Sequence, residues 1–398
     1  MRITTGSGQA QFLAAVQQLE SSIQQTQNQM GSSKSFATAA EDPIGAGQVN
    51  SYNQALAQNR QYTTNSQSAQ SNLQAEDNSL AQVQTQLQSL RTLSLQASTG
   101  TLTSDNKKSI ASQIQQIQQT LVGLANTQNG QGEYLFAGYA TQTKPFALTG
   151  TGATYFGDQG QRQQQIAAGQ SVADGDNGVA VFNQIKTGNG TFQVTAGAAN
   201  TGSGLIGATT VTNPKAYDGG TYNITFPTPA TYQVTDSANN VVSTGAYTDG
   251  VSIDFKGVEV GLSGTPAAND SLTVSASSNQ SIFATVQNLV NGLNNSANNA
   301  LSNNQLGNLV TSAINNIDQA LNSTAGVRSA VGGRLNTLTT QQSVATTQST
   351  QLQTNISGIQ GLDYASAITT LTQQQTTLSA ALQASTLTQG LSLFKYIQ

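Results

Sequence analysis

The sequence contains no histidine, cysteine or tryptophan, and only 8% of its 398 residues are charged. Without histidine and cysteine, the chain cannot form the zinc, haem–histidine or iron–sulfur sites that depend on those ligands. The same absence excludes a histidine general base and the Ser–His or Cys–His nucleophilic pairs. No disulfide can form. We therefore predict no catalytic residue, no metal and no cofactor, and we expect the chain not to be an enzyme.

Charge is scarce in both signs: 14 Lys and Arg residues and 18 Asp and Glu residues give a net charge of −4. The basic residues are spread along the chain, so no basic patch predicts binding to nucleic acid. No apolar run approaches the length of about 18 residues that a membrane span needs, so we expect no membrane insertion. The first residues lack a basic segment followed by a continuous apolar stretch, so we expect no cleaved secretory signal peptide.

Gln, Asn, Ser and Thr take the place of the missing charges, and the spacing of the few apolar residues indicates the fold. In the N-terminal third, apolar residues lie alternately four and three apart, the a/d pattern of a helix in a coiled coil. Because Ser, Thr and Asn are weak helix formers, packing of these stripes must stabilise the helices. The stripes are Phe12, Val16, Leu19, Ile23, Thr26 and Met30, then Leu80, Val83, Leu87, Leu90, Ser94 and Ala97, then Ile110, Ile114, Ile117, Leu121 and Leu124.

The helix boundaries are also predictable. Gly31 is expected to end the first helix, and Asp42 followed by Pro43 is typical of an N-cap and first helical residue. The second helix is expected from 43 to 98, and Ser104 or Asp105 is expected to cap a third that ends near 127. A helix of 55 residues is roughly 80 Å long, which suits a rod rather than a globule.

The middle of the chain has a different pattern. Glycine and proline become frequent between 133 and 278, and strand-like alternation replaces the helical stripes. Short alternating segments separated by Gly, Asn, Asp and Pro turns predict small antiparallel sheets. The clearest segments are TYNITF at 221–226, TYQVTD at 231–236, VSIDFKGVEVGL at 251–262 and SLTVSAS at 271–277.

Helical stripes resume after Ser281 and run to the C-terminus. Glycines at 358 and 361 interrupt a long stripe before the last helix. The stripes contain Ile282, Val286, Leu289 and Leu293, then Val310, Ile314, Ile317 and Leu321, then Val331, Leu335, Leu338, Ala345, Leu352, Ile356 and Ile359, and finally Tyr364, Ile368, Leu371, Gln375, Leu378, Leu382, Leu387, Leu391 and Phe394.

These patterns predict an α+β fold. A long α-helical coiled-coil bundle is formed by the N- and C-terminal segments, and an antiparallel β-rich domain is inserted between its halves. The expected segments are an N-terminal terminal helix in 1–40, the first bundle half in 41–132, the β-rich insert in 133–280, the second bundle half in 281–361 and a C-terminal terminal helix in 362–398.

The two terminal helices are candidates for an assembly surface. Each is amphipathic, has few charges and carries polar residues in its apolar stripe, so that a single chain would bury the stripe poorly. We expect both helices to be frayed in the free subunit and to become ordered on assembly. An ordinary intramolecular bundle is the alternative. The predicted subunit-interface residues are Phe12, Val16, Leu19, Ile23, Leu371, Leu378, Leu382, Leu387, Leu391 and Phe394.

Several segments resemble the flagellin superfamily of bacterial flagellar proteins. At the N-terminal side these are MRITT at 1–5, EDPIGAGQ at 41–48, QALAQNRQYT at 54–63, TGTLTSDNK at 99–107, LANTQNGQGEYLFAGYATQTKPF at 124–146 and YFGD at 155–158. VRSAVGGRLNTL at 327–338 and LDYASAITTLTQQQTTLSAALQASTLTQGLSLFKYI at 362–397 resemble the C-terminal helices of that superfamily. The EDPIG and GEYLFAGY segments are more similar to its hook–filament junction proteins than to filament flagellins. Residues 160–280 carry no resemblance.

The resemblance implies a structural protein of the bacterial flagellum that joins the hook to the filament. It implies self-association into a ring, with hook-associated protein 1 below and flagellin above. It also implies an extracellular place at the hook–filament junction, reached by type III export, and a cytoplasmic export chaperone that masks the C-terminal helix. The alternatives are a filament flagellin and a surface adhesin that displays the β-rich insert.

Three smaller motifs allow both a structural and a functional interpretation. Asp42 and Pro43 are expected to cap a helix and are equally consistent with contact to a neighbouring subunit. The alternating aromatic residues of GEYLFAGY, namely Tyr134, Phe136 and Tyr139, are expected to pack in the core like a strand. Asp174 and Asp176 begin like a calcium loop, but the twelfth position is Ile185 rather than Glu, so a plain turn is expected.

Overall fold

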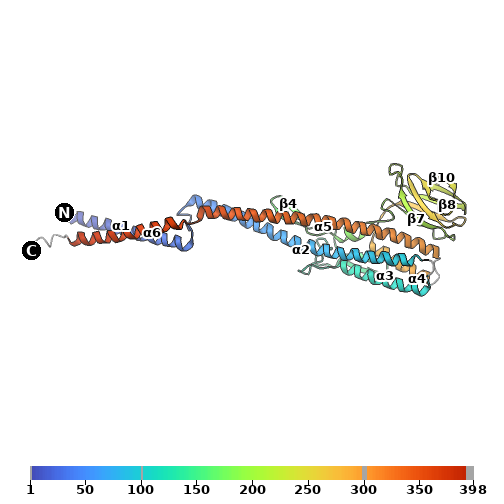
Figure 1. Cartoon of the computed structure of the whole chain (residues 1–398), viewed down its shortest axis with the longest axis horizontal. Coiled ribbons are helices and arrows are strands. Elements are labelled where there is room, and N and C mark those ends of the chain that lie inside the picture. The colour runs from blue at the N-terminus through green and yellow to red at the C-terminus, as the bar shows by residue number, and fades with distance from the viewer. Residues whose placement is uncertain (1, 100–101, 298–302, 391–398) are drawn as a thin grey trace, which may run out of the picture. The chain divides into compact units, whose positions relative to one another are not determined.

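The computed structural model describes residues 2–99, 102–297 and 303–390. The chain forms two compact units, one made of residues 1–64 and 342–398 and the other of residues 65–341. In the first unit the N- and C-terminal segments run side by side (Figure 1). The helices are α1 (Arg2–Ser32), α2 (Pro43–Ala97), α3 (Ser104–Ala125), α4 (Ile282–Ala297), α5 (Asn303–Gln360) and α6 (Tyr364–Gly390).

The N- and C-terminal halves of the chain pair as the apolar stripes predict. α1 packs on α6, and α2 packs on α5. In the first unit Asn59 of α2 donates hydrogen bonds to the carbonyl oxygen of Ala345 and to Oγ of Ser349, both on α5. The α+β prediction, with a helical bundle closed by both halves of the chain, is therefore confirmed.

Helix boundaries agree with the predictions to within a few residues, with three differences. α1 continues through Gly31 to Ser32. α3 is capped by Thr103, whose hydroxyl accepts a hydrogen bond from the backbone N–H of Asn106, rather than by Ser104 or Asp105. The separate stripes beginning at Val310 and Val331 belong to one continuous helix, α5.

The core of the second unit is formed where α2, α3, α4 and α5 pack together. The fully buried Leu, Ile and Val residues of its α-helices lie on the predicted stripes, and a buried Leu or Ile contributes about 1.5–3 kcal/mol. Aromatic residues close the core beside the helices, with Phe182 and Phe136 in edge contact at 5.2 Å between ring centroids. The fully buried residues include Leu80, Leu90, Ile114, Leu121, Phe136, Phe146, Phe283, Val286, Leu289, Leu293, Val310 and Ile317.

The strands form antiparallel sheets in the second unit. A five-stranded sheet has the order β10–β9–β8–β13–β6, a three-stranded sheet has the order β11–β12–β7, and the other strands form pairs. The buried faces of the two larger sheets share one apolar core. The bounds are β1 Phe146–Thr149, β2 Gly152–Tyr155, β3 Gln163–Ala167, β4 Gln170–Ala173, β5 Ile185–Lys186, β6 Phe192–Ala196, β7 Leu205–Val211, β8 Tyr222–Thr228, β9 Thr231–Asp236, β10 Val241–Ala246, β11 Ile253–Phe255, β12 Val258–Ser263, β13 Ser271–Ala276 and β14 Asn279–Gln280, with a π-helix at Val179–Asn183.

The strand predicted for GEYLFAGY is wrong. Residues 133–140 form turns, and Gly138 has a φ of +70°, which glycine adopts without strain. Phe136 is fully buried, as expected of a core residue, and Tyr134 is half-buried. Tyr139 is instead 65% exposed, because the turn directs it away from the core. In the described part of the chain, no helix is both long and apolar enough to cross a membrane.

Candidate assembly surface on the terminal helices

The predicted stripe of α1 is the face that packs on α6. Val16 is 9% exposed, and Phe12, Leu19 and Ile23 are half-buried. Thr26 occupies the next position of the stripe, and its hydroxyl donates a hydrogen bond of 3.2 Å to Oε1 of Gln374 on α6. The structure therefore places the four predicted residues of α1 on one face, and that face is covered in part within the chain.

The face of α6 that packs on α1 differs from the predicted stripe. Leu371 and Leu378 belong to it, but the positions between and beyond them are small or polar residues. The whole row is spaced alternately four and three apart and follows one side of the helix. Its members are Ala367, which is buried, and Leu371, Gln374, Leu378, Ala381 and Ser385, which are half-buried.

Three other large apolar residues of α6 lie outside this row. Ile368 is 51% exposed, Leu382 is 49% exposed and Leu387 is 70% exposed. Leu13 of α1, which the stripe pattern left out, is 58% exposed. In the sequence, two consecutive apolar residues, Phe12 and Leu13, indicate that α1 has a second apolar face. Leu391 and Phe394, also predicted for the interface, lie outside the described residues.

This surface has almost no charge. The 27 residues of α6 include no Asp, Glu, Lys or Arg, and α1 has only Arg2 and Glu20. Its exposed polar side chains are Gln, Ser and Thr, and several Thr hydroxyls of α6 donate to the carbonyl four residues earlier. An uncharged helix pair with exposed Leu and Ile is suited to helix–helix packing with uncharged neighbours and offers no electrostatic selectivity.

A short joint connects the terminal helix pair to the start of α2 and the end of α5. We use this name for residues 33–42 and 361–363. Lys34 and Gly361 form an antiparallel bridge, beside which the N–H of Ser35 donates to the carbonyl of Gln360 at 2.8 Å. Tyr364 donates to the carbonyl of Met30 at 3.0 Å. The two connections are therefore held together by one isolated bridge and the hydrogen bonds beside it.

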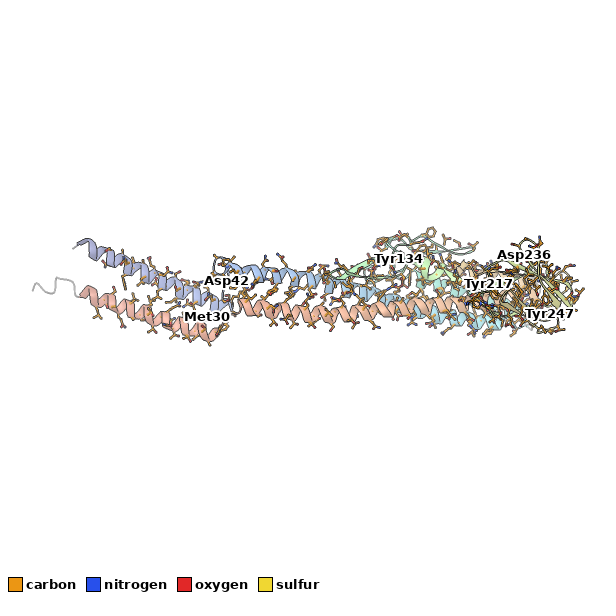
Figure 2. The ribbon with its side chains drawn as sticks, turned by 90° about the horizontal axis from the view of Figure 1, so that it is seen from above. Met30, Asp42, Tyr134, Tyr217, Asp236 and Tyr247 are labelled. Atoms are coloured by element: carbon orange, nitrogen blue, oxygen red, sulfur yellow. The ribbon has the colours of Figure 1, made fainter. Side chains whose placement is uncertain are left out.

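Asp42 lies at the end of this joint, where α2 begins; Figure 2 marks it together with Met30 near the end of α1. The Asp42 carboxylate accepts a hydrogen bond of 2.9 Å from the backbone N–H of Gly45, so the predicted N-cap is confirmed. Phe36 is 5% exposed and anchors the loop. Contact of Asp42 and Pro43 with a neighbouring subunit stays a prediction.

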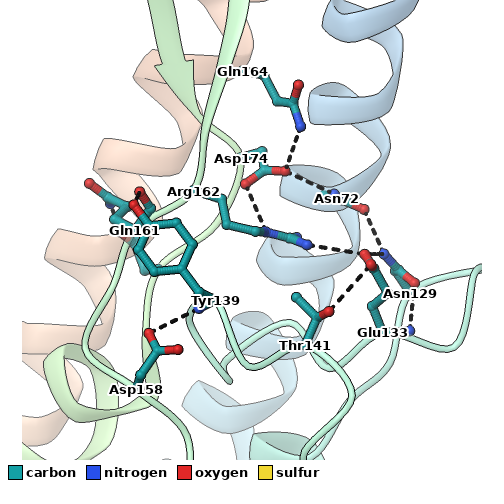
Figure 3. A network of polar contacts seen from close by, with 11 residues as sticks. Asn72, Asn129, Glu133, Tyr139, Thr141, Asp158, Gln161, Arg162, Gln164 and Asp174 are labelled. Carbon is teal, nitrogen blue, oxygen red and sulfur yellow. Dashed lines mark hydrogen bonds and ion pairs between the residues drawn. The ribbon is translucent and has the colours of Figure 1, made fainter.

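The second unit contains a partly buried network of charged and amide side chains (Figure 3). Arg162 lies between Glu133, at 3.1 Å, and Asp174, at 3.3 Å. Arg162 and, to a smaller extent, Asn129 hydrogen-bond to Glu133 and lower the pKa of that carboxyl, although burial opposes the shift. Asp174 also accepts from Asn72 at 3.4 Å. The network ties α2 to the irregular segments on either side of β1–β4.

Two more carboxyl groups lie near this network. Asp176 accepts two hydrogen bonds of 2.9 Å from the guanidinium of Arg334. Glu76 on α2 is 1% exposed, and neither of its carboxylate oxygens has a hydrogen-bond partner among the described atoms. Burial and, secondarily, the charge of Asp176 raise the pKa of Glu76 well above its ordinary value.

Three of the acidic groups of this region, Glu133, Asp174 and Asp176, form ion pairs. Within residues 2–99, 102–297 and 303–390, no group of three or more carboxylates is arranged to hold a metal ion. Asp174 and Asp176 are paired with Arg162 and Arg334 respectively, which fixes this segment of the chain. Residues 174–177, for which the sequence predicted a plain turn, are irregular in the structure.

Three family descriptions match successive parts of the chain. Residues 3–141 match the bacterial flagellin N-terminal helical region, and residues 314–397 match the bacterial flagellin C-terminal helical region. Residues 195–276 match the D2-like domain of flagellar hook-associated protein 1. The β-rich insert, in which the sequence showed no resemblance, is therefore similar to a known flagellar domain.

Individual relatives agree with these matches. Flagellar hook-associated protein 3 of Escherichia coli K12 is 34% identical over 185 residues, which are 46% of this chain and 58% of the relative. The chain thus spans little more than half the length of this curated relative. The crystal structure of FlgL from Xanthomonas campestris is 32% identical with a TM-score of 0.72, covering 77% of this chain and 99% of that one. The flagellar junction protein FlgL from Legionella pneumophila is 29% identical with a TM-score of 0.70, covering 79% and 100%.

Proposed function

The chain belongs to the flagellar hook-associated protein 3 family of the flagellin superfamily, and on that premise we propose that it is a structural subunit of the flagellar hook–filament junction. Its work is to join the hook to the filament and to provide the platform on which flagellin assembles. The family consists of structural proteins, which agrees with a chain that has no histidine or cysteine for catalysis.

The observation that carries this proposal is the exposed apolar surface of the terminal helix pair. Ile368, Leu382 and Leu387 remain about half or more exposed although α6 already packs on α1. Covering one such Leu on a neighbour contributes about 1.5–3 kcal/mol relative to leaving it in water. Repeated over the subunits of an assembly, this gain favours a ring held by its terminal helices.

The partners follow from the same proposal. Subunits associate with one another in a ring, which contacts hook-associated protein 1 on the hook side and flagellin on the filament side. The assembly is extracellular, at the hook–filament junction, and a cytoplasmic export chaperone covers the apolar C-terminal helix before export. The uncharged surface of α6 supports a chaperone that binds through an apolar groove rather than through charge.

The test introduces charge into the exposed face of α6. In a strain that lacks its own copy of the gene, a chain with Leu382→Asp and Leu387→Asp is expected not to support filaments, with flagellin released into the medium. The second unit should keep its near-UV circular dichroism. Gln383→Asp adds a carboxylate at an exposed polar position of the same helix and should leave filaments intact.

Normal filaments from the double variant would overturn the proposal. The deletion strain also distinguishes the junction function from that of a filament flagellin. If the chain were the flagellin, its deletion would leave no flagellin to be released into the medium. It also separates a surface adhesin, whose loss leaves filaments in place.

A further inference from the structure

The strands β6 to β13, residues 192–276, fold around an apolar core of their own, and we call them the β sandwich. Fully buried members of this core include Phe192, Ile224 and Val260. Among the described residues, none that lies in or against this core also belongs to the core of the helices. The attachment of the β sandwich to the helices therefore depends on contacts outside both cores.

A narrow neck connects the β sandwich to the rest of the second unit. We use this name for residues 185–188 and 277–280, in which β5 and β14 pair over two residues each. The N–H of Thr187 donates to the carbonyl of Ser278 at 3.0 Å, and the N–H of Ser278 donates to Oγ1 of Thr187 at 3.0 Å. A few residues at the ends of strands are the usual construction of a hinge between two rigid parts.

A second attachment lies on α5, at Asn308. Its Oδ1 accepts a hydrogen bond of 2.8 Å from the N–H of Ile206, and its Nδ2 donates one of 3.0 Å to the carbonyl of Gly204. Ile206 is in β7, which is an edge of the three-stranded sheet. The Asn308 side chain is 8% exposed and thus occupies the place that a further strand would take beside β7.

Asn304 and Gln305 complete this attachment, and we call them, together with Asn308, the amide clasp. Nδ2 of Asn304 donates to the carbonyl of Gly202 at 3.0 Å, and Nε2 of Gln305 donates to the carbonyl of Ala198 at 2.9 Å. Ala198 follows β6, which is an edge of the five-stranded sheet. The closed clasp therefore holds α5 over an edge of each sheet, where a helix protects the edge from pairing with other chains.

The neck and the amide clasp are separate attachments. The neck is fixed to α5 by the N–H of Gly188, which donates to Oδ1 of Asn316 at 2.8 Å. Asn316 comes eight residues after Asn308, or about 12 Å along the helix. Between the two attachments lies a gap of about 390 Å³, lined by Leu309 and Ser312 of α5 and by residues of β6. The β sandwich is thus held on α5 near the two ends of this gap.

We propose that the neck is a hinge and the amide clasp a latch, so that the β sandwich swings away from α5 and returns without unfolding. Small, polar contacts between compact parts allow such motion, whereas large apolar contacts prevent it. On opening, the amides and the backbone groups that they bond become exposed to water, which replaces each lost hydrogen bond. The motion takes place within a single chain and is independent of the proposed function.

Hydrogen exchange of the full chain tests whether the clasp opens as a unit. Asn304→Ala together with Gln305→Ala removes two members of the clasp and leaves Asn308 in place. The amide of Ile206, still bonded to Asn308, is expected to exchange at least about tenfold faster, which corresponds to about 1.4 kcal/mol in the free energy of opening. The amide of Val274, in the core of the β sandwich, should exchange at the rate of the parent chain.

Asn336→Ala, at an exposed position of α5, is the control and should leave both amides at the rate of the parent chain. An unchanged rate at Ile206 in the chain with Asn304→Ala and Gln305→Ala would overturn the proposal, because the amides would then act as separate bonds. Faster exchange at Val274 as well would also contradict it, because the β sandwich would then unfold rather than swing.

Spin labels measure the motion directly, because the chain has no cysteine of its own. Labels at Ala238→Cys on the β sandwich and Gln119→Cys on α3, both exposed positions, should give one narrow distance distribution. Adding Asn308→Leu, which removes two bonds of the clasp, should add a second and broader distribution. Labels at Gln88→Cys and Gln119→Cys, both on helices, should give one narrow distribution with or without Asn308→Leu.

Gly307→Ala opens the latch in a second way. A Cβ at this position would come within 2.8 Å of Cδ2 of Leu205, so the methyl group pushes β7 away from α5 while every amide of the clasp is retained. The same labels on the β sandwich and α3 should again show the broader distribution. A single narrow distribution with Asn308→Leu and with Gly307→Ala would overturn the proposal. Loss of the dispersed strand amide resonances in both variants would contradict it too, because the latch must open without unfolding.

Discussion

Two helices of this chain use similar residues in opposite ways. α4 has 16 residues and buries six large apolar side chains: Ile282, Phe283, Val286, Leu289, Val290 and Leu293. α6 has 27 residues and five Leu or Ile residues with described side chains, none of which is buried; among the residues of α6 with described side chains, the small Ala367 alone is buried. The difference lies in the neighbours. α4 packs against α3, β2 and the π-helix, whereas the main packing partner of α6 among the described residues is α1.

The two units also differ in their use of charge. The five ion pairs of the described chain all lie within residues 65–341. The terminal helices have almost no charged residues to pair. The ion pairs of the second unit are thus completed within one chain, whereas the terminal helices of the first unit keep large apolar side chains exposed. Four predictions test this difference, beginning with the largest effect.

Truncating one leucine in each helix measures the difference in packing. Leu293→Ala removes a fully buried side chain of α4 and should lower the free energy of unfolding of the second unit by about 2–5 kcal/mol. Leu382→Ala removes a side chain that is 49% exposed and should change the stability of the free subunit by less than about 0.5 kcal/mol. Urea denaturation followed by local hydrogen exchange gives both values. Equal losses would show that α6 is already covered within the chain.

Removing an arginine from each of two ion pairs tests how the burial of an ion pair affects the stability that is lost when the pair is broken. Arg162→Met leaves Asp174, whose side chain is 2% exposed, without its cation. Breaking a fully buried pair costs about 3–5 kcal/mol, and the 22% exposure of Arg162 reduces our expectation to about 2–4 kcal/mol. Arg91→Met breaks a pair whose side chains are 41% and 38% exposed, and should cost less than about 1 kcal/mol.

The double variant with Arg162→Met and Asp174→Asn supplies the control for this experiment. It removes the unpaired negative charge and should regain part of the stability lost in Arg162→Met. Thermal denaturation at low ionic strength measures the stability of the parent chain, Arg162→Met, Arg91→Met and the double variant. No recovery in the double variant would mean that Arg162 acts by packing rather than by charge.

Glu76 gives the second unit a pH dependence. Its folded-state pKa is raised, so both states are protonated in acid, and the unfolded chain loses its proton first as the pH rises. Stability is therefore complete below the ordinary pKa and falls between that value and the raised one, by about 1.4 kcal/mol per pH unit. Glu76→Gln should match the parent chain near pH 4 and exceed its stability at pH 7.

Asp254→Asn, at an exposed position of the same unit, is the control for Glu76→Gln and should reproduce the pH profile of the parent chain. Stability is measured by urea denaturation from pH 4 to pH 8. A constant difference between Glu76→Gln and the parent chain over that range would mean that the carboxyl does not titrate on unfolding.

The sequence predicts the helices better than their faces. Spacing placed α2 at 43–98, against Pro43–Ala97 in the structure, because a long apolar stripe and an Asp–Pro cap are local signals. On α6 it selected large residues such as Leu382, but the face that packs on α1 includes Ala367 and Ala381. Small residues allow close approach of two helices, and a pattern search for large apolar residues does not detect them.

The polar network was beyond prediction for a different reason. Arg334 and Asp176 are far apart in the sequence, and only the folded chain brings them within 2.9 Å. Tyr139 shows the same limit on a shorter scale: alternation suggested a buried strand, whereas Gly138 at positive φ turns the chain and leaves the ring 65% exposed. Local patterns determine helices, and long-range contacts determine which charges and rings are buried.

The smallest predicted effect concerns the cap of α2 in the first unit. Asp42→Ala removes the acceptor for the N–H of Gly45 and should destabilise the start of α2 by about 1 kcal/mol. Asp42→Asn keeps an acceptor oxygen and should recover most of that loss, since Asn is also a good N-cap. Hydrogen exchange of residues 45–49 gives the local free energy. If Asp42→Ala lowers this protection slightly but abolishes filaments, Asp42 contacts a neighbouring subunit as well as its own helix; unchanged filaments would limit its role to the cap.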